Sequence, residues 1–100
     1  VRDWARADSE RPAAHRFAAR IYEDMGAIDL AEEAATRAAD RGPSDAGAWE
    51  RLGRLRLRLA DREGALSALG RASELGAGES VREPIEQALA LEPRSAASAA

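Results

Sequence analysis

The sequence of 100 residues contains no cysteine, no lysine, no asparagine and only one histidine, His15. The absence of cysteine excludes disulfides, thiol nucleophiles and cysteine-bound metals. One histidine cannot form a cluster of histidine ligands, so we expect neither a metal site nor a cofactor. We interpret His15 as a structural side chain on a helix, with its hydrogen bonds satisfied. These absences together predict that the chain is not an enzyme.

Aromatic residues and long apolar runs are also scarce. The chain has two Trp, one Tyr and one Phe, and no apolar run approaches the roughly 20 residues of a membrane span. No signal peptide is visible, and the chain starts at Val1 without Met, so we expect it to be a piece of a longer protein. Its compartment stays open, with cytoplasm and periplasm as alternatives. The excess of Arg and Ala is consistent with GC-rich coding and a bacterial source.

The residues that are present favour helix throughout. Ala, Leu, Glu and Arg dominate, β-branched residues are few, and no segment alternates with period two. Because Ala supplies most of the apolar share, the core must be thin and close-packed. The net charge of −3 and the pI near 5.2 argue against a surface that follows nucleic-acid phosphates. The composition therefore predicts an all-α protein that does not bind nucleic acid.

A shift of 34 residues aligns the chain with itself, without a gap, over residues 12–45 and 46–79. Identical pairs are Ala14/Ala48, Arg20/Arg54, Ala31/Ala65, Ala34/Ala68, Arg37/Arg71, Ala38/Ala72 and Gly42/Gly76. Apolar residues at helical spacing predict two helices in each block, at 13–25 and 30–41 and at about 49–59 and 65–75. Residues 60–63 are expected to form the turn of the second block, and the glycines at 76–78 to end it.

A 34-residue unit of two helices with this pattern resembles the tetratricopeptide repeat. The resemblance rests, in the two blocks, on Ala19, Tyr22, Gly26, Ala31, Ala38 and Pro43, and on Trp49, Leu52, Gly53, Ala65, Leu69, Ala72 and Leu75. It implies an α-solenoid of stacked antiparallel helix pairs, a fragment of a right-handed superhelix. The two blocks differ at three equivalent positions of the pattern. The first block has His15 where the second has Trp49, and the second block has Arg56 and Ala77 where the first has Tyr22 and Pro43.

Trp49 and Gly53 lie one turn apart on the first helix of the second block. A glycine inside a helix costs about 1 kcal/mol relative to alanine, so a contact must compensate. In the repeat interpretation Trp49 packs between the helices of its own unit and the neighbouring unit. Gly53 then lies where two helix backbones approach each other closely.

The ends of the chain are assigned by the same period. Residues 1–11 are expected to form a partial helix of a preceding repeat or an N-terminal cap. Residues 80–93 are expected to form a C-terminal capping helix, with Ser80 and Glu83 in a capping box and Pro84 in the first turn. Residues 94–100 are expected to be a flexible tail.

Two further features have structural interpretations. Glu32 and Glu33 form an acidic pair that we expect to lie in solvent on a helix surface. Arg56 falls within the apolar sector of its helix, so its stem should pack while its head reaches water or pairs with an acidic residue. A contact with a neighbouring repeat or a partner is the alternative for Arg56.

The distribution of Arg suggests a binding surface. On a helical wheel Arg51, Arg54 and Arg58 lie opposite the apolar sector of the first helix in the second block. Arg16 and Arg20 fall on the comparable side in the first block. The resemblance implies that these helices line a concave groove that holds peptide segments. The predicted groove residues are Arg16, Arg20, Glu23, Glu50, Arg54, Leu57 and Arg58. Because Arg binds carboxylates in a bidentate manner, an acidic segment or a C-terminal carboxylate is the expected ligand. The family's best-known carboxylate-binding arrangement uses Lys and Asn, which this chain lacks, and an ordinary solvated face is the alternative.

The function predicted from these features is a non-catalytic protein–protein interaction module that binds a partner segment in the Arg-lined groove. One alternative is a structural spacer or self-association segment of a larger bacterial secretion, assembly or regulatory protein. Apolar edges at Val1 and Trp4, or at Ile85 and Leu89, would drive such self-association through the terminal helices. Another alternative is a regulatory domain fused to an enzyme.

Overall fold

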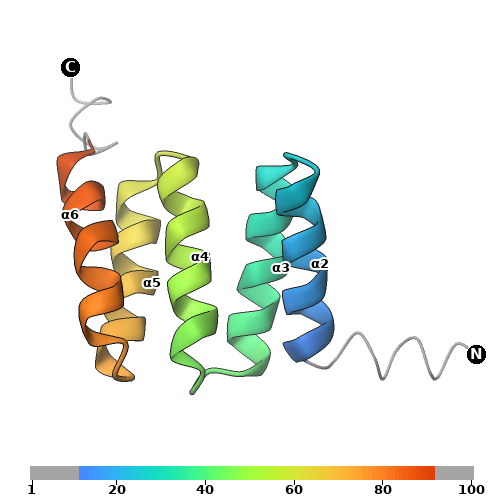
Figure 1. Ribbon diagram of the computed structural model, residues 1–100, viewed down its shortest axis with the longest axis horizontal. Coiled ribbons are helices and arrows are strands. Elements are labelled where there is room, and N and C mark those ends of the chain that lie inside the picture. The colour runs from blue at the N-terminus through green and yellow to red at the C-terminus, as the bar shows by residue number, and fades with distance from the viewer. Residues whose placement is uncertain (1–11, 92–100) are drawn as a thin grey trace, which may run out of the picture.

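The computed structural model describes residues 12–91, and every regular element in this range is a helix, with no strand (Figure 1). Its α-helices are α2 (Pro12–Asp24), α3 (Ile28–Arg41), α4 (Ala46–Arg58), α5 (Arg62–Glu74) and α6 (Arg82–Ala90), with a 3-10 turn at Gly78–Val81 before α6. The all-α prediction is confirmed. The expectations for residues 1–11 and for the tail at 94–100 lie outside the described residues.

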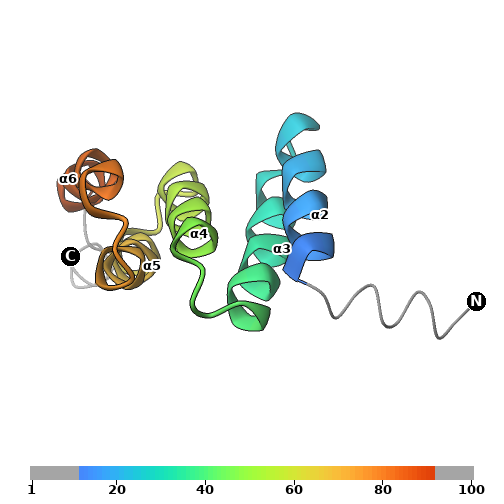
Figure 2. The same cartoon turned by 60° about the horizontal axis from the view of Figure 1, so that its bottom comes forward.

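The helices stack in sequence as antiparallel neighbours. The pairs α2–α3 and α4–α5 pack most extensively, and contacts of α3 with α4 and of α5 with α6 join the pairs into one row. The view in Figure 2, which is turned about the horizontal axis, shows that the row has two layers. One layer contains α2, α4 and α6, and the other contains α3 and α5. In the first layer α2 and α4 are the first helices of the two predicted units, and α6 lies in the segment predicted as a C-terminal capping helix.

Alanine builds most of the core. Eleven of the fifteen buried apolar residues in the described part of the chain are Ala, and the others are Leu52, Leu55, Leu69 and Val81. No polar or charged residue within the described range is fully buried. The core forms two clusters, one around α2, α3 and α4 and one around α5 and α6. Short side chains let the helix axes approach closely, as the composition predicted.

Trp49 joins these two clusters. It is half-buried and packs against both of them, which confirms the position expected for it. Its indole Nε1 donates a hydrogen bond to the carbonyl of Pro43 at 3.0 Å. The guanidinium carbon of Arg71 lies 5.6 Å from the ring centroid, within the range of a cation–π contact. Trp49 thus contacts both the preceding loop and the helix that pairs with its own.

Two kinds of local signal fix the helix ends. The carboxylates of Asp45 and Asp61 accept hydrogen bonds of 3.0 Å from the backbone N–H groups of Gly47 and Gly64, which caps α4 and α5. The cap at Asp61 starts α5 at Arg62, so the turn is shorter than the predicted 60–63. Backbone φ angles in the left-handed region, +80° at Gly26 and +58° at Ala60, follow α2 and α4 at positions 34 residues apart.

The predicted capping box at Ser80 and Glu83 is wrong. The Ser80 hydroxyl donates to Oε1 of Glu50 at 2.8 Å and lies 3.0 Å from the carbonyl of Ala77, while the Glu83 carboxylate accepts from Gln87. Because Ser80 belongs to the 3-10 turn, α6 begins at Arg82 and makes no side-chain cap bond at its start. Val81 and Ala88 nevertheless join the cluster of α5, so α6 covers that helix.

Arg56 forms a half-buried ion pair with Glu32. Its Nε lies 3.0 Å from Oε2 of Glu32, and its Nη1 donates to the carbonyl of Gly64 at 3.2 Å. Only about a fifth of each of the two charged side chains is exposed, at 21% for Arg56 and 23% for Glu32. The prediction that Arg56 pairs with an acidic residue is confirmed. The prediction that Glu32 lies in solvent is wrong, because the pair holds it between α3 and α4; Glu33 is exposed as expected.

Candidate functional site

A cavity of about 320 Å³ lies between α2 and α4, in the layer formed by the first helix of each pair. It is lined by Glu23 from α2 and by Gly47, Glu50, Arg51, Arg54, Leu55 and Arg58 from α4. Most of the polar lining is charged, and the fully buried Leu55 provides an apolar wall.

The spacing of residues on α4 explains why these side chains converge. Gly47, Glu50, Arg54 and Arg58 follow one another at intervals of three or four residues, which places them along one face of the helix. The same helix buries Ala48, Leu52 and Gly53 in the core. Gly47 has no side chain, and a β-carbon there would lie 3.3 Å from Oδ1 of Asp45, the carboxylate that caps this helix.

Ion pairs hold two of the three guanidinium groups of the cavity. Nη1 of Arg51 lies 2.9 Å from Oε1 of Glu23, which connects α4 to α2. Arg54 pairs with Glu50 at 3.1 Å, and its Nη2 also donates to the carbonyl of Ser80 at 3.0 Å. Since the Ser80 hydroxyl donates to Glu50 as well, this network connects α4 to the 3-10 turn before α6.

Arg58 is the third guanidinium group of the cavity, and it differs from the other two. It is exposed at the C-terminal end of α4, and it makes no ion pair within residues 12–91. The lining thus contains three guanidinium groups and two carboxylates, which leaves one positive charge. A guanidinium group of this kind can receive a carboxylate through two parallel hydrogen bonds.

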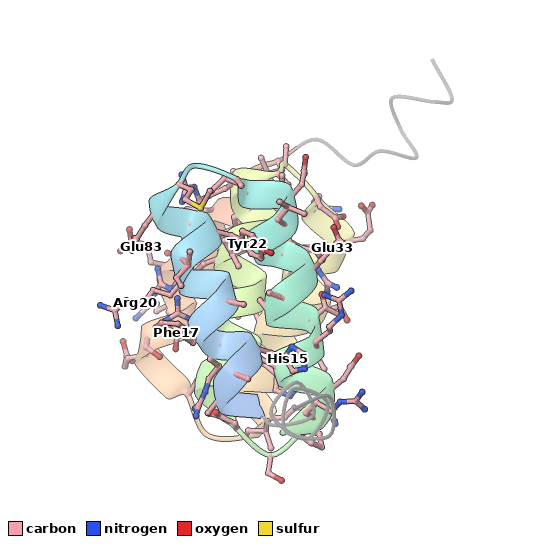
Figure 3. All side chains as sticks on the ribbon, turned by 90° about the vertical axis from the view of Figure 1, so that its right-hand side faces the viewer. His15, Phe17, Arg20, Tyr22, Glu33 and Glu83 are labelled. Atoms are coloured by element: carbon pink, nitrogen blue, oxygen red, sulfur yellow. The ribbon has the colours of Figure 1, made fainter. Side chains whose placement is uncertain are left out.

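The structure brings together four of the predicted groove residues and separates the other three. Glu23, Glu50, Arg54 and Arg58 line the cavity. Arg16 lies outside it, because its Nη1 pairs with Asp45 at 3.1 Å. Arg20 is exposed and extends from the side of α2 that faces away from α3 (Figure 3). Leu57 packs against the cluster of α5 and α6 and also does not line the cavity.

Three lining residues were not among those predicted: Gly47, Arg51 and Leu55. Arg51 lies with Arg54 and Arg58 on the helical wheel, but it is not among the predicted groove residues. Leu55 belongs to the apolar sector, and its second role as a wall of the cavity has no signal in the sequence. Gly47 offers no side chain from which a pattern could be recognised.

A metal site and a membrane-spanning helix are both absent from residues 12–91, and His15 does not line the cavity. Among the described residues no group of three or more His, Cys, Asp and Glu side chains could hold a metal ion, and no helix is long and apolar enough to cross a membrane. His15 lies instead on the side of α2 next to α3 (Figure 3). Its Nε2 is buried and makes no hydrogen bond within residues 12–91, so the expectation of a satisfied histidine is wrong.

A protein-family model covers the helices that form the cavity. Residues 12–55, which comprise α2, α3 and most of α4, match the family model described as tetratricopeptide repeat. No curated protein matches the chain. The matched range includes both helices that form the cavity and every lining residue except Arg58.

Proposed function

From the membership of residues 12–55 in the tetratricopeptide repeat family, we propose that the chain binds an acidic segment of a partner protein in the cavity between α2 and α4. Repeats of this family generally mediate protein–protein interactions, and the family is typically non-catalytic. The proposed contact surface consists of the residues that line the cavity.

The observation that carries the proposal is Arg58, which has no carboxylate partner within the described residues. The neighbouring Arg51 and Arg54 already have carboxylate partners, so a bound carboxylate at Arg58 would complete the charge balance of the cavity. A ligand with a basic side chain would add a second unbalanced positive charge. The charge of the cavity therefore favours an acidic segment over a basic one.

The internal bonds of the cavity support the same proposal by reducing the cost of binding. Glu23 orients Arg51, and the Glu50–Ser80 contact orients Arg54 before any ligand arrives. Side chains that are already ordered lose less conformational entropy on binding. Arg54 keeps about half of its side chain exposed, at 53%, so its remaining donors are accessible.

The proposal can be tested by NMR titration of the ¹⁵N-labelled chain with a decapeptide of glutamate. We expect the amides of Gly47 and Arg58 to shift most, with an affinity that decreases as the salt concentration rises. Arg58→Glu should weaken binding at least about tenfold, because it replaces the unpaired cation with a like charge. Arg58→Lys should retain part of the affinity, since it keeps the charge but loses the planar fork.

Arg37→Glu is the matched control, because it makes the same charge change on an exposed position of α3. This variant should bind the glutamate peptide nearly as well as the original chain. A decapeptide of lysine should not shift the cavity amides. Equal binding of the two peptides, or equal losses in the Arg58 and Arg37 variants, would show that the cavity does not select an acidic ligand.

A further inference from the structure

An apolar stripe on α2 remains exposed to solvent. Phe17, Ile21 and Met25 follow one another at intervals of four residues, so they lie along one face of the helix. Their exposed fractions are 67%, 41% and 71%. Met25 comes just after the last residue of α2, but its N–H bonds the carbonyl of Ile21 at 3.0 Å, so it continues the helical turn.

The stripe has a charged residue of each sign on one flank. Arg20 and Asp24 are four residues apart, and both are exposed. Neither makes an ion pair or a side-chain hydrogen bond within the described range. Figure 3 shows Phe17 and Arg20 on the side of α2 that faces away from α3, so the stripe and its flank are accessible.

We propose that this stripe is a dimer interface, and that its occupant is the same stripe of a second copy of the chain in antiparallel orientation. A two-fold axis near Ile21 places Phe17 of each copy against Met25 of the other. The same axis brings the Arg20 flank of one copy beside the Asp24 flank of the other. Because the arrangement is symmetric, both the apolar contact and the ion pair occur twice.

The complementarity of the flank is the reason to assign a second copy to this face. Arg20 and Asp24 are centred on residue 22, close to the position of the proposed axis, so opposite charges meet in the antiparallel arrangement. In a parallel two-fold arrangement the Arg20 and Asp24 flanks of the two copies would lie on opposite edges of the interface, so these charges would not meet. The stripe offers only a few hundred Å² per copy, at the small end of protein interfaces, so we expect a weak dimer that is half formed at roughly 0.1–1 mM.

Sedimentation equilibrium of the full 100-residue chain, from about 10 µM to 1 mM, tests the proposal. We expect the average mass to rise toward that of a dimer with concentration. Ile21→Glu should abolish the rise, because it places two like charges at the axis. Arg20→Asp and Asp24→Arg should each weaken the dimer at least about tenfold, since each variant alone opposes like charges.

An equimolar mixture of Arg20→Asp and Asp24→Arg should dimerise, because the acidic flank of one variant then meets the basic flank of the other. Leu89→Glu and Arg37→Glu change exposed positions on α6 and α3 and should leave the dimer unchanged. Far-UV circular dichroism confirms that each variant is folded. A chain that remains monomeric at all concentrations overturns the proposal. So does a dimer that Ile21→Glu leaves intact, one that Leu89→Glu abolishes, or a mixture that does not associate.

Discussion

Gly53 of α4 lies directly against Leu69 of α5. A β-carbon at Gly53 would lie 2.5 Å from Cγ and 2.6 Å from Cδ2 of Leu69, and 3.3 Å from its backbone nitrogen. Contacts of this length are shorter than van der Waals packing allows, and Leu69 is itself fully buried. The two helices are therefore at the closest distance that a residue without a side chain permits.

Gly53→Ala should lower the free energy of unfolding by about 1–3 kcal/mol, because overpacking outweighs the gain in helix propensity. Gly70→Ala is the matched control. Gly70 also lies inside a helix, but a β-carbon there meets nothing within 4 Å. It should raise the free energy of unfolding by about 0.5–1 kcal/mol. Urea unfolding followed by circular dichroism measures both, and a stabilised Gly53→Ala variant would contradict the close approach.

Ala60→Gly should stabilise the chain by about 0.5–1 kcal/mol. Ala60 has a φ of +58°, in the left-handed region that costs an L-residue about 1–2 kcal/mol, whereas glycine adopts it freely. The reverse change at the equivalent turn, Gly26→Ala, should destabilise by about 1 kcal/mol, since Gly26 has a φ of +80° and open space around it. Thermal unfolding of the two variants should give shifts of opposite sign; shifts of the same sign would refute this explanation.

A double-mutant cycle of Arg56→Met and Glu32→Gln should give a coupling energy of about 1 kcal/mol. The pair is 3.0 Å apart and mostly shielded from water, so solvent screens it little. The comparison pair is Arg71 and Glu74, which are 3.7 Å apart with 52% and 72% of their side chains exposed. Its coupling should be close to zero in the same urea experiment. A coupling at Arg56 no larger than that of the exposed pair would mean that the half-buried pair contributes no specific stability.

Trp49→Ala should destabilise the chain by about 3 kcal/mol, and it should also lower the urea m-value. Trp49 packs against both core clusters, so its loss removes a contact between the units and makes unfolding less cooperative. Trp49→Phe keeps most of the apolar contact and loses the bond to Pro43, so it should cost about 1 kcal/mol. An unchanged m-value in Trp49→Ala would show that the clusters remain coupled without the indole.

Much of the fold follows from the sequence because the 34-residue period acts on every element at once. The 34-residue shift aligns Gly53 with Ala19 and Trp49 with His15. This alignment predicts Gly53 at a close contact between helices and Trp49 between two units. The structure places both residues as expected. The Ser80–Glu83 box failed because a side chain distant in sequence, Glu50, accepts the Ser80 hydroxyl. A local motif contains no information about such a competitor.

The cavity was predictable only in part for the same reason. A helical wheel shows that Arg51, Arg54 and Arg58 share a face, but it does not show which of them meets a carboxylate from another helix. Arg16 pairs with Asp45, 29 positions away, and so lies outside the cavity. Leu57 was placed on the exposed face of α4, yet it packs against the cluster that α6 helps to form. Each of these positions depends on tertiary contacts rather than on periodicity.

The alanine core has a mechanical consequence. Alanine has no side-chain rotamers, so ordering it on folding costs only backbone entropy. For the same reason a core made mainly of alanine has no second way to pack around a displaced helix. Larger side chains could accommodate a shift between helices by changing rotamer, but alanine side chains cannot. The stack of helices should therefore behave as an elastic rod, and its curvature should change through small tilts of whole helices. The long side chains on its surface can still change rotamer when they contact a ligand.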